Sequence, residues 1–223
     1  MAIAHPPTRQ FQAFITNLDY ARQMINAGKS LTGLQPGALD IGDLYRAAWV
    51  QSVSAIEHWL HEELYRRVAE LLAEPGKPLP QKLRKLELPV SLVERVHEQE
   101  MTFADAISTQ VRRRWEMLPL HNPDQISAAL GLVTDHNVWR KAAHQLNTWH
   151  HHRTDYNGDQ LKTRFRSIVE RRHKIAHYAD LEDGHLKRRR PITESETTDA
   201  VDWIQRIALA IAKALDASAG QET

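Results

Sequence analysis

Apolar residues along the 223-residue chain recur every three or four positions in almost every long segment, and alternating β-branched runs are scarce. This period predicts amphipathic helices and hence an all-α fold. The first helix is expected over residues 8–27, with one apolar face formed by Phe11, Phe14, Ile15, Leu18, Ala21 and Ile25. Gly28 and the turn-rich segment that follows it predict the end of this helix.

A second, longer helix is predicted to begin near Asp40, a suitable N-cap residue, and to continue to about residue 73. Its apolar residues drift around the helix surface instead of forming one stripe, which is typical of a helix at the centre of a domain. The prolines of the segment "EPGKPLP", residues 74–80, are expected to end it.

The middle of the chain, about 81–157, has a less regular pattern, in which a short helix and a longer one are expected first. Asn122 as N-cap, Pro123 at the first helical position and Gly131 as a stop signal then mark a further helix. Another helix follows over about 137–149. We interpret this region as a helical insertion that packs on a bundle.

Two further helices complete the pattern. One covers about 160–178, and the last begins with a capping box formed by Thr193 and Glu196. The basic loop between them lacks a helical period, and the tail, about 216–223, is expected to be frayed. No repeat and no linker divides the sequence, so we expect a single domain over residues 1–223.

The composition is that of an ordinary globular protein, with 42% hydrophobic and 26% charged residues. The absence of cysteine excludes disulfides, thiolate nucleophiles and sulfur-ligated metal sites. The amino-terminal residues lack the apolar core of a signal peptide, and no segment has the length and hydrophobicity of a membrane span. A cytoplasmic protein without membrane contact is therefore expected.

The net charge is close to zero over the whole chain but uneven along it. The formal charge of the chain is +1, whereas residues 161–190 contain ten Lys or Arg and four Asp or Glu. A basic segment on a nearly neutral protein fits a phosphate-bearing partner such as RNA. It equally fits a solvated surface, and charge alone does not separate the two.

Within this basic segment, His173 and His177 are four residues apart and lie on one face of the predicted helix. This spacing is that of half a zinc site. However, the stretch "HKIAH" lacks the adjacent glutamate of HExxH metalloproteases, and the positive charges of Arg171, Arg172 and Lys174 disfavour a divalent cation. A metal-dependent helical protein is one alternative.

Arg172 and His177 suggest a different chemistry. An arginine fork binds a phosphodiester and stabilises the charge that builds on it. A histidine takes a proton from a ribose 2′-hydroxyl or returns one to a leaving 5′-oxygen. These two functions suffice for metal-independent RNA cleavage. On one straight helix the two side chains would point about 140° apart, so a dimer that pairs two such helices around one cleft would present them better.

The stretch "IVERRHKIAHYADL", the basic loop after it and the final capped helix resemble the carboxy-terminal half of a HEPN domain, a nucleotide-binding helical family with an Arg-x4-6-His motif. The segment "DLYRAAWVQSVSAIEHWLHEEL", residues 43–64, resembles the long helix of the RiboL-PSP type of HEPN protein. The resemblance covers residues 43–64 and 165–215 and matches the middle only in helical character.

The resemblance implies an all-α bundle and a homodimer whose motif helices face each other. It also implies an endoribonuclease that needs no metal or other cofactor and leaves 2′,3′-cyclic phosphate and 5′-hydroxyl ends. Members of the family often act in toxin–antitoxin, phage-defence or stress systems. The expected partners are therefore RNA, a second copy of the chain, and an antitoxin or defence-system protein.

The resemblance also assigns roles to residues. His177 becomes the general base or acid, Arg172 the phosphate binder and His173 a supporting residue. Glu57 and Ser54 on the long helix would support the site, with Glu57 buttressing Arg172, although either could equally be a packing residue without a role. The RNA backbone would be held by the basic residues Arg171, Lys174, Lys187, Arg188, Arg189 and Arg190.

Two alternatives remain beside the metal-dependent one. A HEPN-like module could bind nucleotides, RNA or protein without cutting. A plain helical interaction protein would need neither Arg172 nor His177. The ribonuclease interpretation predicts activity in the presence of a chelator, which the metal-dependent interpretation does not.

Overall fold

The computed structural model describes most of the chain, namely residues 4–34, 40–74, 76 and 78–216. Within these residues it consists of nine α-helices joined by turns, and the only β-pairing among them is one isolated bridge between Leu181 and Arg189. The predicted all-α fold is confirmed. None of the described helices is both long and apolar enough to cross a membrane.

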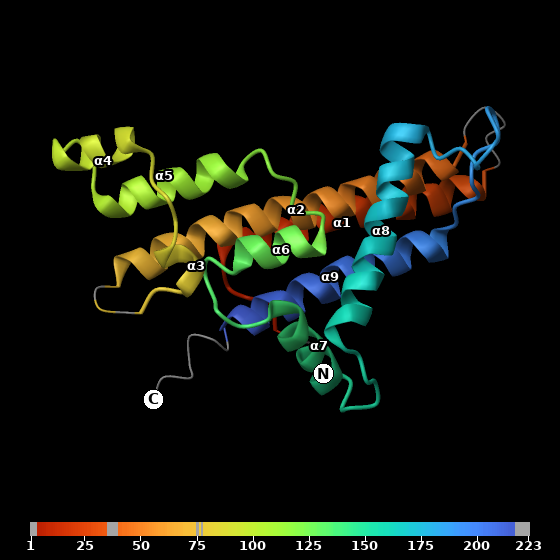
Figure 1. Cartoon of the computed structure of the whole chain (residues 1–223). Coiled ribbons are helices and arrows are strands. Elements are labelled where there is room, and N and C mark those ends of the chain that lie inside the picture. The colour runs from red at the N-terminus through yellow and green to blue at the C-terminus, as the bar shows by residue number, and fades with distance from the viewer. Residues whose placement is uncertain (1–3, 35–39, 75, 77, 217–223) are drawn as a thin grey trace.

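Three long helices form the body of the molecule: α1 (Arg9–Thr32), α2 (Gly42–Ala73) and α9 (Glu194–Asp216). α1 and α2 run side by side, and α9 packs against both of them (Figure 1). Phe11 of α1 meets Trp59 of α2 edge to face, with ring centroids 5.6 Å apart, and both side chains are buried. As the drift of its apolar residues predicted, α2 lies at the centre, since helices pack on it from several sides.

The ends of the first two helices differ from the prediction. α1 continues through Gly28 to Thr32, so the predicted stop at Gly28 is wrong. A Cβ atom at position 28 would lie 2.7 Å from the Tyr45 ring, so this glycine permits the close approach of α1 and α2. α2 begins at Gly42, whose N–H donates to the Asp40 carboxylate over 2.9 Å. Asp40 therefore caps the start of the helix from two residues before its first residue.

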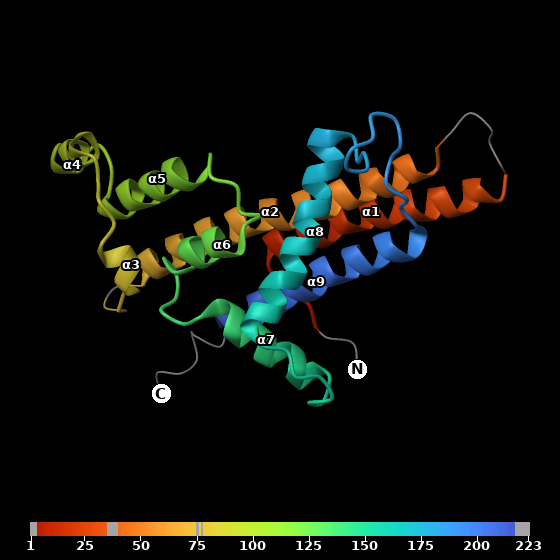
Figure 2. The same ribbon diagram turned by 45° about the vertical axis from the view of Figure 1, so that its right-hand side comes forward.

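The middle of the chain forms five shorter helices: α3 (Gln81–Arg84), α4 (Val90–His97), α5 (Phe103–Trp115), α6 (Pro123–Leu130) and α7 (Val138–Trp149). The predicted start of α6 is confirmed, because the Asn122 side chain accepts from the Asp124 N–H over 2.8 Å. α4 and α5 form a hairpin at one end of the molecule (Figures 1 and 2). Apolar residues of α5, α6 and α7 join the core of the long helices, so the region packs as one unit with the bundle.

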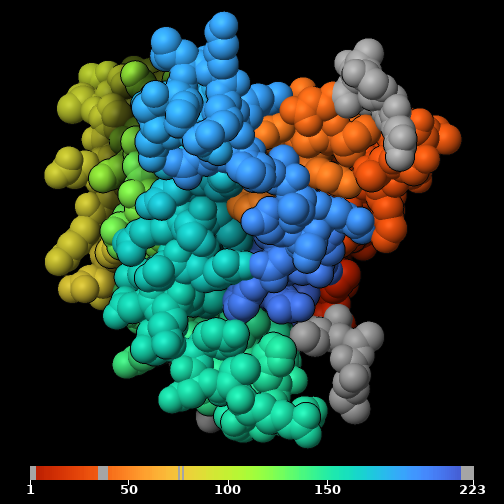
Figure 3. Space-filling model, turned by 90° about the vertical axis from the view of Figure 1, so that its right-hand side faces the viewer, coloured from red at the N-terminus to blue at the C-terminus, as the bar shows by residue number. Residues whose placement is uncertain are grey.

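α8 (Gly158–Tyr178) crosses the long helices steeply, as both ribbon views show (Figures 1 and 2). The side chains of Asn157 and Gln160 cap its start reciprocally. Its first half packs against α7 and α9 and buries Leu161, Phe165, Ile168 and Val169. The second half is mostly polar, and together with the segment that follows it lies on one face of the molecule, next to α9 (Figure 3).

α8 ends in two consecutive left-handed residues, Ala179 with φ 48° and Asp180 with φ 56°. The chain then turns back toward the start of α2 before it enters α9. The predicted capping box of α9 is confirmed, since Thr193 and Glu196 each accept a hydrogen bond from the other's backbone N–H. The frayed tail predicted for the last residues falls mostly on 217–223, which lie outside the described residues.

Candidate functional site

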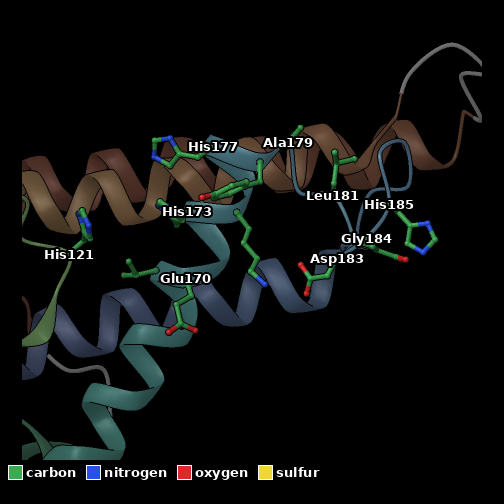
Figure 4. Close-up of a pocket in the computed structure, with 13 residues that line it drawn as sticks. His121, Glu170, His173, His177, Ala179, Leu181, Asp183, Gly184 and His185 are labelled. Carbon is green, nitrogen blue, oxygen red and sulfur yellow. The ribbon is translucent and has the colours of Figure 1, made fainter.

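A groove of about 930 Å³ lies beside the second half of α8. α8 supplies one wall, and the segment 179–185 that follows it supplies further lining residues. His121 reaches the groove from the connection between α5 and α6 (Figure 4). The groove therefore gathers polar side chains from distant parts of the sequence.

The α8 wall carries a pair of histidines. His173 and His177 lie on one face of the helix, and their ring centroids are 4.6 Å apart. The exposed ring of Tyr178 lies 5.5 Å from that of His173, and Glu170 adds a negative charge one turn earlier. Lys174 lines the same groove and forms no ion pair with any described residue. Three predicted site residues, two histidines and a lysine, are thus brought together.

Arg172, the other half of the predicted motif, is not among the residues that line the groove. Its side chain is half-buried, and its Nε atom is buried without a hydrogen-bond partner among the described residues. The angle of about 140° expected between Arg172 and His177 on one helix explains this separation. Within a single chain, therefore, the two residues do not share the groove.

Arg171, which was predicted to hold RNA, is engaged inside the protein. The buried carboxylate of Asp180 accepts from Arg171 Nη2 over 2.8 Å and from Arg46 Nε over 2.9 Å. Arg46 also donates to the carbonyl of Arg190 over 2.8 Å, and Arg171 donates to that of Pro191 over 3.0 Å. This network ties the end of α8 and the segment after it to the start of α2, and it thereby fixes one wall of the groove.

The basic run 187–190 is mostly paired with acidic residues. Its three arginines each form an ion pair: Arg188 with Glu182, Arg189 with Asp43, and Arg190 with Asp183. Lys187 is exposed and has no ion pair with any described residue. Exposed pairs of this kind are weak, so a phosphate can compete for these arginines. Among the predicted RNA-binding residues, Lys174 and Lys187 keep an uncompensated charge.

The two predicted supporting residues lie on α2, where Ser54 is half-buried. Glu57 contacts His121, with 3.4 Å between its Oε1 atom and the Nδ1 atom of the histidine, and it forms no ion pair with Arg172. The predicted buttress of Arg172 is therefore replaced by a histidine–carboxylate pair. The sequence assigned no role to His121 or to Asp180, although Asp180 lies within the quoted stretch "IVERRHKIAHYADL". The partners of both residues, Glu57 and Arg46, are far away in the sequence.

The structure also bears on the metal-dependent alternative. His173 and His177 would offer two nitrogen ligands from one helix face. Among the described residues, however, no group of three or more His, Asp or Glu side chains is placed to hold a metal ion. A structural zinc site needs four protein ligands and a catalytic one needs three, so the pair alone falls short of either.

No protein-family model, no curated protein and no solved structure matches this chain. The resemblance to HEPN proteins therefore rests on the quoted sequence stretches. The part of it that the structure confirms is the all-helical architecture.

Proposed function

We propose that this protein is a metal-independent endoribonuclease whose active site is the groove along α8. Its reaction is attack of a ribose 2′-hydroxyl on the adjacent phosphate, which leaves a 2′,3′-cyclic phosphate and a 5′-hydroxyl end. One observation carries the proposal: His173 and His177, with ring centroids 4.6 Å apart, stand beside Lys174 in one open groove. Histidine is the side chain best suited to move protons near neutral pH.

Each of these side chains has a part in the proposed reaction. His177 transfers a proton at the reacting phosphate, and His173 supports it through the ring contact. Lys174 attracts the phosphate and stabilises the negative charge that develops in the transition state. The exposed ring of Tyr178 in the same groove offers a stacking surface for an RNA base.

Arg172 enters the proposal through a second copy of the chain. Because it does not line the groove of its own chain, a HEPN-like homodimer would be needed to bring an arginine to the phosphate. An antitoxin or defence-system partner enters the proposal only through the resemblance to HEPN proteins. A cytoplasmic place of action, expected from the sequence alone, is also part of the proposal.

The substrate side of the proposal is tested with one RNA in two forms. The purified protein is first incubated in EDTA with total cellular RNA, which identifies a sequence that it cuts. An RNA oligonucleotide of that sequence is then tested unmodified and with every 2′-hydroxyl methylated. We expect cleavage of the unmodified RNA with 2′,3′-cyclic phosphate ends and no cleavage of the methylated form. Cleavage of both forms, or cleavage that appears only when EDTA is left out, would reject the mechanism.

A binding module that does not cut RNA is the second candidate. It is favoured by the position of Arg172, half-buried and off the groove, and by the unpaired charges of Lys174 and Lys187. Such a module would bind RNA with an affinity that falls as salt rises and would leave the RNA intact under every condition.

A further inference from the structure

Cleavage by a 2′-hydroxyl needs two proton transfers on opposite sides of phosphorus. The attacking 2′-oxygen and the leaving 5′-oxygen stand in line across the phosphorus atom. His173 and His177 lie side by side on one helix face, so they approach a bound phosphate from the same direction. The groove needs a second titratable side chain on another wall.

Two histidines outside α8 line the groove, His121 and His185. Nε2 of His185 already lies 3.0 Å from Arg188 Nη2, so His121 is the better candidate. Every other lining residue belongs to α8 or to the segment 179–185, whereas His121 comes from the connection before α6. Figure 4 shows it on a separate segment, on the side of the groove away from Gly184. About a third of its side chain is exposed (33%), so the ring is accessible and also held in place.

Glu57 determines how the His121 ring is presented. Its carboxylate lies 3.4 Å from Nδ1, which is long for a hydrogen bond, so the pair is weak in the unbound protein and can tighten when a ligand binds. A carboxylate accepts the proton on Nδ1 and thereby leaves Nε2 of the neutral ring unprotonated. That nitrogen can then accept a proton from a bound ligand.

We infer that His121 is the general base of the proposed ribonuclease and that Glu57 is its positioning residue; the inference rests on the proposed function. Nε2 of His121 takes the proton of the 2′-hydroxyl while the 2′-oxygen forms its bond to phosphorus. The bond between phosphorus and the 5′-oxygen breaks, and protonated His177 gives its proton to the 5′-oxygen. His121 ends protonated and His177 neutral, and proton exchange with water restores both.

The roles of general base and general acid can be distinguished by changing the leaving group of the RNA substrate. The probes are short mixed-sequence RNA oligonucleotides with one 5′-bridging sulfur and their all-oxygen counterparts. A thiolate leaves without being protonated, because its pKa is far below that of an alcohol. The sulfur substrate therefore still needs the base but no longer needs the acid.

The variants are His121→Ala, His177→Ala and Glu57→Gln, with His97→Ala on the exposed surface of α4 as the control. On the oxygen substrate we expect the first two to lose about 100-fold to 10,000-fold in cleavage rate. On the sulfur substrate His177→Ala recovers most of the wild-type rate and His121→Ala does not. Glu57→Gln shows a smaller loss that sulfur also fails to restore, and His97→Ala matches the wild type.

Three outcomes would overturn the inference. Wild-type activity of His121→Ala on both substrates removes His121 from the reaction while the proposed function stands. Recovery of His121→Ala, but not of His177→Ala, by sulfur would reverse the roles and reject His121 as the base. Failure of the wild type to cut either substrate would reject the proposed function itself. The melting temperature of each variant checks that a loss of rate is not a loss of fold.

Discussion

Two buried carboxylates, Glu63 and Asp180, are each bound by two arginines, and the two clusters lie toward opposite ends of α2. The Glu63 cluster lies within one helix. The Asp180 cluster joins parts of the chain that are far apart in the sequence. Ion pairs of the same kind thus stabilise mainly one helix in the first case and hold a wall of the groove in place in the second.

The Glu63 cluster forms mainly within α2, although Arg67 also donates to Asp216 of α9. Arg66 and Arg67, three and four residues later, each donate to the Glu63 carboxylate over 2.6 Å, as expected for neighbours on one helix face. Burial alone would raise the pKa of Glu63, but the hydrogen bonds and charges of Arg66 and Arg67 outweigh it and hold this pKa below its usual range.

The Asp180 cluster depends on tertiary structure. Arg46 reaches Asp180 across 134 residues of sequence, and the aspartate itself has a left-handed backbone. Its second carboxylate oxygen, Oδ1, is buried without a hydrogen-bond partner among the described residues. Local pairs reinforce a helix that would form anyway, whereas the long-range pair holds a wall of the groove in a conformation that the backbone does not favour.

The largest expected effect is that of Asp180→Ala. It removes the buried acceptor of Arg46 Nε and leaves Arg46 only its longer ion pairs with the exposed carboxylates of Asp40 and Asp43. We therefore expect the free energy of unfolding to fall by about 3 kcal/mol, the low end of the range for breaking a buried pair. Urea unfolding measures the loss. Asp183→Ala is the matched control, because it removes an exposed partner of Arg190, and its cost should stay below about 1 kcal/mol. Equal losses of unfolding free energy in the two variants would show that the buried Asp180 cluster stabilises the fold no more than an exposed ion pair does.

Glu63→Gln should cost less, about 2 kcal/mol at neutral pH, because the amide keeps the shape and both arginines lie near the surface. The cost should depend on pH. Since the pKa of Glu63 is lower in the folded state, its stabilisation is complete above the unfolded pKa of about 4.3 and is lost as the pH falls through the folded pKa. The free energies of unfolding of wild type and variant should therefore converge in acid. A difference that stays constant with pH would contradict a lowered pKa of Glu63 in the folded state.

A smaller effect is expected at the tip of the segment that Asp180 holds. Lys187→Ala should weaken RNA binding and reduce the slope of log affinity against log salt by about 0.7, the value for one contact to single-stranded RNA. Arg188→Ala should change the slope less, because Arg188 already pairs with Glu182. Fluorescence anisotropy with a labelled RNA at several salt concentrations gives both slopes, and an unchanged slope for Lys187→Ala would exclude this contact.

The smallest effect, and the only stabilising one, is expected next to Asp180. Ala179 has φ 48°, a left-handed conformation in which glycine is not strained. Ala179→Gly should raise the free energy of unfolding by less than about 1 kcal/mol, because the relief of strain exceeds the entropy that glycine gains in the unfolded chain. A loss of stability on thermal unfolding would mean that the Ala179 methyl group makes a contact that matters more than the strain.

The sequence predicted those features that depend on residues close together in the chain. The caps at Asn122 and Thr193 and the shared face of His173 and His177 follow from spacings of two to four residues. The end of α1 was missed because Gly28 packs against Tyr45 of another helix.

His121 and Asp180 could not be found from the sequence for the same physical reason. Their partners, Glu57 and Arg46, lie 64 and 134 residues away, and only the packing of α2 against the later segments brings them together. The role of Arg172 likewise depends on surroundings that no local spacing specifies. It lies on the motif helix as predicted but outside the groove of its own chain.

The most direct test of the proposed ribonuclease is the cleavage rate of His177→Ala relative to wild type. Both proteins, together with His97→Ala as a surface control, are purified in parallel and assayed in EDTA on an RNA that the wild type cuts. We expect the wild type and the control to cleave at the same rate and His177→Ala to be slower by about 100-fold or more. Equal cleavage by all three proteins would show that the groove along α8 is not where RNA is cut.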